Sequence, residues 1–516
     1  MDGDTALSAA DIDFEKFRLR RFVDRLIEIG EVDIHDEPVS LLEIGAIIEG
    51  SPRASLFRKA GPEHLEIVGA VAGGRRRLAA AFGVDARDVA REYMRRMDDP
   101  QPMVEVASAD APVHQRVIAG DKVDLTTLPF HLQHEFDGGA YLTSGIDYTV
   151  DPATGKPNVG CRRLMLRSRT TLQANLTQPS DLRRIYMGCV ERGEKLPVSY
   201  VVGSHPLDFL AAGLRLPVDE FGLVASLRGE PMPMVRGVSN NVPVPADAEI
   251  VIEGYFDELG YREIEGPYGE FNGLYGAPHI DPVFHATAIT MRNDALHQTM
   301  LHSGRLLSRT DSGNLAAINS EIAVWRALGA IHLEPAAVRS MPSANGRQHM
   351  RVAIPRGTPG QARRVISALF AIPYIKHVFV VDDDIDVFAD EEVEWALSTR
   401  FRADRDMVVQ PGFPAFYMEP VAEPDGTVTK AGFDLTEPYG KPDTIDNWIA
   451  VAPRLDPAAR FQNVRQALET SPMFFSGLVE GLGSDDGREI ALALHELREE
   501  GVLTRLDNGE WALKSD

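Results

Sequence analysis

Short apolar runs alternate with turn residues through the middle of the chain. Residues 141–150 are rich in Tyr, Thr, Ile and Val, and a Pro/Gly/Asp-rich turn at 151–157 separates them from a second apolar run at 158–166. Two strand-like runs joined by such a turn are typical of a β-hairpin. Similar runs recur at 197–203, 249–254 and 283–291. The pattern predicts that residues 121–325 form a β-barrel or sandwich with inserted helices.

Mixed helical and strand patterns flank this region. Residues 1–120 and 326–455 combine helical spacing with strand-like runs, so each predicts an α/β segment. A helix is predicted over 311–328, with Asp311 or Ser312 as its N-cap. The tail, 456–516, predicts helices at 458–469, 474–482 and 486–500, followed by a hairpin. The expected fold class is an α+β multidomain protein with a central β domain between two α/β domains.

Charge and cysteine content narrow the function classes. The chain has 516 residues and a formal net charge of −24, which argues against a nucleic-acid partner because phosphate binding needs a basic face. Its two cysteines, Cys161 and Cys189, suit a reducing compartment. Residues 1–4 begin no apolar signal segment, and no apolar run reaches membrane-spanning length. A cytoplasmic protein with no membrane partner is expected.

Candidate chemistry centres on the segment Glu265-Gly266-Pro267-Tyr268-Gly269-Glu270. Pro and two Gly residues exclude a regular helix, so a tight loop is predicted that brings the two carboxylates toward one space. Paired acids push their proton affinities apart, so that one donates a proton while the other stays charged. From these residues alone, an ordinary surface turn and a metal-dependent hydrolase that uses the Glu265/Glu270 pair both remain open.

Several separated stretches together resemble the UbiD family of prenylated-FMN-dependent decarboxylases. In chain order these stretches are 137–143, 151–155 leading to 158–160, Glu220 with 227–229, 244–250, 265–270 and 377–386. The similarity is collinear over residues 11 to 450. It implies a split β-barrel that holds the flavin, an α/β domain on either side, and a C-terminal domain used in dimerisation. Family members are dimers or hexamers, so a homodimer or homohexamer is expected.

The resemblance also implies a catalytic set of one arginine and two acids. By motif these are Arg163, Glu265 and Glu270. Arg163 is expected to orient the substrate carboxylate, because its planar fork makes two parallel hydrogen bonds. Glu265 is expected to pair with Arg163, and Glu270 to donate the proton that replaces CO₂. Side chains are poor electron sinks, so a cofactor has to accept the electrons that decarboxylation releases.

The cofactor site implied by the resemblance contains prenylated FMN, a divalent metal ion (manganese, with magnesium as the alternative) and K⁺. The family's metal ligands are Asn, His and Glu; Asn158 and Glu220 match, whereas Asp181 stands where the family has His. Aspartate binds hard divalent ions well, but Asp181 is equally consistent with a helix N-cap. Cys161, Arg163 and Lys430 complete the expected cofactor contacts.

The sequence gives little information about which substrate the protein binds. Phe271, Thr177 and Ser180 are the expected pocket residues, and they favour a flat acid. The predicted activity is reversible, non-oxidative decarboxylation of an aromatic or heteroaromatic carboxylic acid, or of an α,β-unsaturated one. A flavin prenyltransferase would supply the cofactor. The alternatives are the hydrolase and a non-catalytic flavin-binding homologue.

Overall fold

A computed structural model describes residues 12–214, 219–416, 418–440 and 444–514. The chain divides into two compact units, one ending at Thr436 and the other beginning at Glu437. Residues 1–4, on which the absence of a signal segment was judged, lie outside the described part. Among the described residues, none of the helices is both long and apolar enough to cross a membrane. The domain boundaries expected after residues 120, 325 and 455 stay predictions.

The first unit begins with a small sheet and four helices. The order is α1 (Leu19–Glu28), β1 (Val32–His35), α2 (Ile44–Gly50), β2 (Ala54–Ala60), β3 (Leu65–Gly69), α3 (Arg75–Phe82) and α4 (Val89–Met97). β1 pairs parallel with β2, β2 antiparallel with β3, and β3 parallel with β18 (His297–Thr299). The predicted α/β character of this segment is confirmed.

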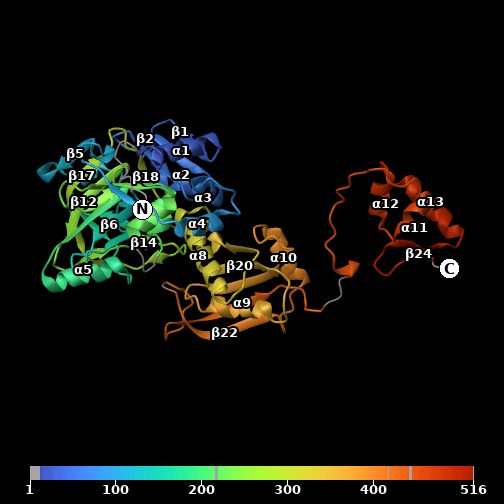
Figure 1. Ribbon diagram of the computed structural model, residues 1–516. Coiled ribbons are helices and arrows are strands. Elements are labelled where there is room, and N and C mark those ends of the chain that lie inside the picture. Colours follow the sequence, from blue (N-terminus) through green and yellow to red (C-terminus); the bar gives the residue numbers. More distant parts are fainter. Residues whose placement is uncertain (1–11, 215–218, 417, 441–443, 515–516) are drawn as a thin grey trace, which may run out of the picture. The chain divides into compact units, whose positions relative to one another are not determined.

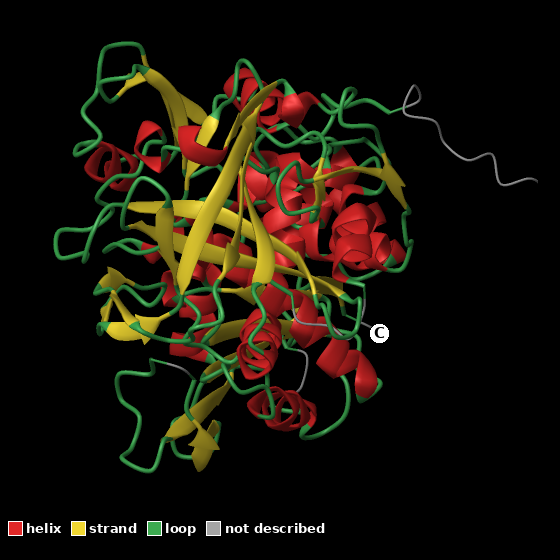
Figure 2. Cartoon of the chain, turned by 90° about the vertical axis from the view of Figure 1, so that its left-hand side faces the viewer, coloured by secondary structure: helices red, strands yellow, loops and turns green. Residues whose placement is uncertain are grey.

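A closed antiparallel barrel follows. Its strands pair in the order β12 (Ile250–Phe256), β9 (Leu196–Val202), β6 (Tyr141–Val150), β7 (Pro157–Leu166), β8 (Thr171–Ala174) and β17 (Val283–Met291). β12 also pairs with β17, which closes the ring, and β5 (Arg116–Ala119) extends it beyond β17. In Figure 2 the long strands of the barrel cross one another at steep angles, and a group of helices lies beside them. The predicted hairpin is β6–β7, so the predicted central β domain is confirmed as a barrel.

Helices and short strands surround the barrel. α5 (Asp181–Arg192) buries Leu182, Ile185 and Tyr186 in the same apolar cluster as the barrel residues Tyr200 and Phe284. α6 (Pro206–Ala212) and α7 (Glu220–Arg228) join the other large cluster, which contains the N-terminal helices. The short strands are β4 (Met103–Glu105), β10 (Met232–Arg236), β11 (Pro243–Pro245), β13 (Glu263–Glu265), β14 (Tyr268–Gly269), β15 (Tyr275–Gly276) and β16 (His279–Asp281).

The helix α8 (Asp311–Ala330) connects the barrel part to a second α/β layer, as Figure 1 shows. It packs against α4 and α6 on one side and against α9 (Gln361–Phe370) and β19 (Ala337–Ser340) on the other. The sheet order is β19, β20 (His349–Ile354), β21 (His377–Asp382), β23 (Thr427–Asp434) and β22 (Met407–Pro414), with α10 (Asp390–Thr399) following β21.

The cap predicted for α8 was wrong. Thr310 is the N-cap, and its hydroxyl accepts a hydrogen bond from the Gly313 amide at 3.0 Å. The buried carboxylate of Asp311 instead accepts hydrogen bonds from the backbone amides of Ala72 and Leu301, at 2.7 and 2.8 Å. Asp311 therefore ties the start of α8 to the loop after β3.

The second unit contains α11 (Val464–Thr470), α12 (Phe475–Leu482), α13 (Arg488–Glu499) and the hairpin β24 (Leu503–Arg505) with β25 (Trp511–Leu513). Its own apolar cluster includes Leu478, Ile490 and Leu494. The predicted helices and hairpin are confirmed, but the first helix begins at Val464 and not at residue 458. Asn463 ends the extended segment there, because its side chain caps α11 by accepting from the Gln466 amide at 2.9 Å.

Candidate active site

The two acidic residues of the central motif lie on either side of the short strand β14. Glu265 ends β13, β14 follows, and Glu270 begins a turn in which its amide donates to the Leu274 carbonyl at 2.8 Å. Gly266 has a φ of +86°, which favours glycine. At Gly269 a Cβ would lie 2.4 Å from Nδ1 of His134, so the His134 ring fits there only because the side chain is absent.

A second glycine-containing stretch holds this segment in place. The Gly138 amide donates to the Pro267 carbonyl at 2.7 Å, and Oδ1 of Asp137 accepts from the Gly269 amide at 2.9 Å. A Cβ at Gly138 would meet the Gly266 carbonyl oxygen at 2.1 Å. The motif at 137–143 is therefore the structural partner of the motif at 265–270, although more than a hundred residues separate them.

Arg163 joins both acids. Its Nε and Nη2 donate to Oε1 and Oε2 of Glu265, each at 2.8 Å, and its Nη1 donates to Oε1 of Glu270 at 2.6 Å. The guanidinium also lies over the ring of Tyr268, with 4.4 Å between its central carbon and the ring centroid. All three charged side chains are at most 11% exposed. A bidentate, buried geometry of this kind fixes the guanidinium plane.

The environment keeps Glu265 ionised. Burial by itself raises the pKa of Glu265, but hydrogen bonds from Arg163 and His279 outweigh it and lower the pKa to about 2. Burial likewise lowers the pKa of Arg163, while its hydrogen bonds to Glu265 raise that pKa well above the usual range. Glu265 and Arg163 therefore form a permanent ion pair at ordinary pH.

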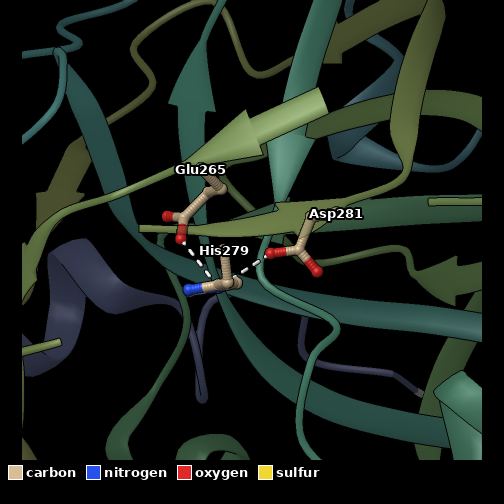
Figure 3. Close-up of side chains that lie close together, drawn as sticks. All are labelled: Glu265, His279 and Asp281. Atoms are coloured by element: carbon tan, nitrogen blue, oxygen red, sulfur yellow. Dashed lines mark ion pairs between the residues drawn. The ribbon is translucent and has the colours of Figure 1, made fainter. Parts of the chain in front are cut away.

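A histidine and a further acidic residue lie beside Glu265. His279 lies between Glu265 and Asp281, with its Nε2 3.1 Å from Oε2 of Glu265 and 2.9 Å from Oδ2 of Asp281 (Figure 3). In the antiparallel pairing of β13 with β16, His279 stands directly opposite Glu265. Among the described residues these three side chains form a group within ligand distance of one another.

A cavity of about 800 Å³ opens beside Arg163 and Glu270. Eight of the residues predicted for the site line it: Asn158, Cys161, Arg163, Ser180, Asp181, Glu220, Glu270 and Phe271. They come from β7, from the starts of α5 and α7, and from the turn after β14. The structure thus brings into one space residues that span more than a hundred positions of the chain.

Asn158, Asp181 and Glu220, the predicted metal ligands, all line the cavity, and each has a side-chain oxygen. Glu220 accepts a hydrogen bond from the Val159 amide at 2.6 Å, which holds it beside Asn158. Burial raises the pKa of Glu220 to about 7, and the nearby charges of Asp181 and Asp147 add to the increase. Such an acidic, oxygen-only set fits a hard divalent cation. Asp181 and Glu220 also open α5 and α7, whose N-termini favour an anion such as phosphate.

Asp181 is not the cap of its helix. Ser180 is the N-cap of α5, and its hydroxyl accepts from the Arg183 amide at 3.2 Å. Asp181 occupies the first helical position, where Arg184 pairs with it at 3.3 Å. The N-cap interpretation of Asp181 was therefore wrong, and its carboxylate remains at the cavity wall.

The cavity is not lined by three of the predicted site residues, Glu265, Lys430 and Thr177. Lys430, on β23, is 1% exposed, and its ammonium donates to the carbonyls of Phe370 and Ile372 at 2.8 and 2.7 Å. Thr177 turns its hydroxyl toward Asp281, 3.3 Å away. Lys430 therefore binds the carbonyl groups at the C-terminal end of α9. Thr177 belongs to the polar group that surrounds Asp281.

Several lining residues were missed. Arg347, Tyr374 and Phe416 lie far along the sequence from the predicted site, in stretches without a recognisable motif. The guanidinium of Arg347 lies 5.8 Å from the ring centroid of Phe271 and 5.7 Å from that of Phe416. One missed pair did have a signal: residues two apart on a strand share a face, and His279 and Asp281 are two apart between prolines.

Family models match most of the chain. The N-terminal, Rift-related and C-terminal domains of 3-octaprenyl-4-hydroxybenzoate carboxy-lyase match residues 23–97, 104–305 and 313–435. The chain belongs to the UbiD family of carboxy-lyases. The predicted family and the predicted enzyme class are confirmed, and the hydrolase and non-catalytic alternatives are set aside.

Two decarboxylases match this chain over most of its length and over nearly all of their own. An anhydromevalonate phosphate decarboxylase of Methanosarcina mazei is 32% identical over 426 residues, which cover 81% of this chain and 96% of that protein. A phenolic acid decarboxylase of a Streptomyces species is 28% identical over 464 residues, or 86% and 96%.

Solved structures agree with the observed fold. The UbiD-class enzyme HmfF from Pelotomaculum thermopropionicum, in complex with FMN, has a TM-score of 0.78 at 29% identity and covers 84% of this chain and 97% of its own. An evolved dimeric form of HmfF in complex with prenylated FMN has a TM-score of 0.75 at 28% identity, with coverage of 85% and 97%.

Proposed function

We propose that this UbiD-family protein uses prenylated FMN to decarboxylate an aromatic or heteroaromatic carboxylic acid, reversibly and without net oxidation. The observation that carries the proposal is the buried Arg163–Glu265–Glu270 group at the wall of a cavity large enough for a flavin and a small acid. Aromatic side chains from Phe271, Tyr374 and Phe416 line the same cavity, which suits a flat substrate. HmfF binds FMN and prenylated FMN, and one relative is a phenolic acid decarboxylase.

The cofactor site fits the residues present. Asn158, Asp181 and Glu220 would hold Mn²⁺ or Mg²⁺ against the flavin phosphate, with K⁺ nearby, and the N-termini of α5 and α7 would favour the phosphate charge. A flavin prenyltransferase would supply the cofactor. When bound, the prenylated flavin supplies the electron sink that decarboxylation needs. Homodimer or homohexamer formation remains our expectation.

The protein side chains position the acid and move one proton. Arg163, held flat by Glu265, presents its guanidinium to the cavity and orients the substrate carboxylate. The C–C bond breaks and CO₂ leaves. Glu270 then gives its proton to the carbon that carried the carboxylate, and a proton from solvent restores Glu270. In the reverse direction, Glu270 takes that proton from the C–H bond.

The test uses protein co-expressed with a flavin prenyltransferase and purified with Mn²⁺ and K⁺. Benzoic, hydroxybenzoic, pyrrole, indole and cinnamic-type acids are assayed for CO₂ release, and their decarboxylated products for deuterium uptake from D₂O. We expect a bound modified flavin, and turnover of at least one aromatic or heteroaromatic acid. Flavin-loaded protein that turns over only non-aromatic acids would contradict the substrate class, and protein that binds no flavin with excess Mn²⁺ would contradict the cofactor.

A phosphorylated acid is the second candidate substrate. Arg326 and Arg347 line the cavity in addition to Arg162 and Arg163, and guanidinium groups bind phosphate well. The guanidinium of Arg347 lies 5.8 Å from the ring centroid of Phe271, which lines the same cavity. The relative from Methanosarcina mazei is an anhydromevalonate phosphate decarboxylase. Including this phosphorylated acid in the same assay distinguishes the two candidates.

A further inference from the structure

His279 stands between the carboxylates of Glu265 and Asp281 (Figure 3). The ring belongs to β16, and Asp281 is two residues further along the same strand. Glu265 and Asp281 are fully buried, whereas the His279 side chain is 18% exposed. The contact is thus built by strand pairing and lies next to the proposed reaction centre without being part of its wall.

We propose that His279, paired with Asp281, is a positively charged positioning residue that locks Glu265 in its ionised, Arg163-bound state. The catalytic part of this inference rests on the proposed function, but the charge on His279 does not. His279 touches neither substrate nor cofactor in this assignment and acts through Glu265.

The surrounding acceptors require two ring protons. Nδ1 of His279 lies 2.9 Å from the Ala277 carbonyl oxygen, which can only accept, so Nδ1 carries a hydrogen. Nε2 faces Oε2 of Glu265 and Oδ2 of Asp281, and carboxylate oxygens accept hydrogen bonds, so Nε2 needs a hydrogen as well. The structure places Nδ2 of Asn175, a donor, 2.9 Å from Nε2. A protonated Nε2 therefore requires the Asn175 amide in the flipped orientation, with its oxygen facing the ring.

The nearby charges favour this protonation. The charged groups around the ring are Asp281 on its own strand, Glu265 on β13 and, beyond Glu265, Arg163 on β7. Hydrogen bonds to Asp281 and Glu265 raise the pKa of His279 to about 10, although burial opposes the increase. With His279 charged, the two cations balance Glu265 and Asp281.

A metal ion between the same three side chains is the competing interpretation. Both oxygens of Glu265 already accept from Arg163, and Oδ1 of Asp281 accepts from the Leu176 amide at 2.8 Å. A divalent metal ion would place two positive charges across the Glu265 carboxylate from the guanidinium, whereas an imidazolium places one there. An imidazolium satisfies the same acceptors while spreading its charge over the ring, so the geometry favours it.

The deciding experiment measures His279 directly by NMR of the full chain carrying isotope-labelled histidine, with the His279 signals assigned by His279→Gln or His279→Asn. We expect both ring nitrogens to stay protonated from about pH 5 to about pH 9, well above the usual midpoint of about 6.5. In Asp281→Asn the midpoint should fall by about 2 pH units or more. A wild-type midpoint near 6.5 would overturn the proposal, whether or not any variant folds.

Two further measurements complete the test. Asp257→Asn is the matched control, because it removes the partner of a different histidine, His285, whose Nε2 lies 2.7 Å from Oδ2 of Asp257; it should leave the His279 midpoint unchanged. Adding Zn²⁺ alone should leave Nε2 of His279 protonated. Loss of that proton on adding Zn²⁺ would assign the three side chains to a metal site and overturn the proposal.

The catalytic consequence has its own readout. His279→Gln should keep the bound flavin and lose about 100-fold in turnover, whereas His279→Lys, which restores a cation, should recover about tenfold of that loss. Equal losses in both variants would show a merely structural role and overturn the positioning assignment. Wild-type protein without decarboxylase activity would refute the proposed function and leave the NMR result on His279 standing.

Discussion

Arg163 binds Glu265 through two parallel hydrogen bonds of 2.8 Å each and uses its third nitrogen for Glu270. Lysine cannot reproduce this fork, because an ammonium group is a single point charge. We therefore expect Arg163→Lys to lower turnover about 100-fold or more, with flavin still bound. Steady-state decarboxylation on flavin-loaded protein measures the loss. Full activity in this variant would mean that only the charge at residue 163 matters.

Glu270 is expected to be the proton donor. Glu270→Gln keeps the shape of the side chain and a carbonyl oxygen for Arg163, but it removes the acidic proton. We expect decarboxylation to fall by about 10²–10⁴-fold, with unchanged flavin absorption. Glu263→Gln is the matched control, since Glu263 lies on β13 and pairs with Arg167 at 2.8 Å, and it should stay active. Deuterium exchange into the product that survives Glu270→Gln would rule out this role.

Because of Glu220, the stability of the folded protein should depend on pH and on metal binding. Its folded-state pKa of about 7 lies above the ordinary 4.5, so the folded protein binds this proton more tightly than the unfolded chain does. This contribution is complete below about pH 4.5 and is lost as pH rises through about 7. The metal-free Tm should therefore fall across this range, and Mn²⁺ should raise it most at the upper end.

The control for that measurement is Glu220→Gln, which carries no titrating carboxyl group. In this variant the Mn²⁺-dependent rise in Tm should be much smaller at every pH. A Mn²⁺ effect of the same size in both proteins would place the metal elsewhere.

Gly269 should tolerate no side chain. Because a Cβ there would lie 2.4 Å from the His134 ring, Gly269→Ala should destabilise the protein by about 1–3 kcal/mol and displace Glu270. Urea unfolding and turnover measure the two effects. Gly329→Ala is the matched control: a Cβ at Gly329, inside α8, would meet nothing within 4 Å, so the change should be neutral or stabilising. Equal stability of the two variants would contradict the packing argument.

Arg347 should distinguish the two candidate substrates. Arg347→Met keeps an unbranched side chain beside Phe271 and Phe416 but removes the charge. If a phosphorylated acid is the substrate, KM for it should rise about tenfold or more, while activity on simple aromatic acids changes little. Comparison of kcat and KM for both acids measures the difference. An unchanged KM for the phosphorylated acid would exclude Arg347 as its anchor.

The sequence predicted those parts of the protein that depend on local pattern. The β6–β7 hairpin was visible because two strand-like runs flank a Pro/Gly turn, and the Glu265–Glu270 pair was visible because Gly and Pro exclude a helix. Closure of the barrel by the pairing of β12 with β17 was not predictable in the same way, since long-range pairing leaves no local signal.

The same limit applies to the site. Family resemblance supplied Asn158, Arg163 and Glu220 by motif, but not the residues that the fold adds from elsewhere, such as Phe416 and Arg347. Lys430 shows the opposite error. A cofactor contact was expected, whereas the residue lies on β23 with its ammonium buried against two carbonyls, a placement that depends on the packing of α9. The local sequence does not single out His279, because its role depends on its contact with a residue of the neighbouring strand.

One residue of α8 has a consequence for engineering the substrate range. Ile322 lines the cavity, yet it is only 2% exposed and belongs to the apolar cluster that also contains N-terminal helix residues. Enlarging the cavity by shortening Ile322 would also remove core packing, at a cost of about 2–5 kcal/mol. Its neighbour Ala323 lines the same cavity from a half-buried position outside that cluster. Directed evolution of the substrate range should therefore accept changes at Ala323 before it accepts changes at Ile322.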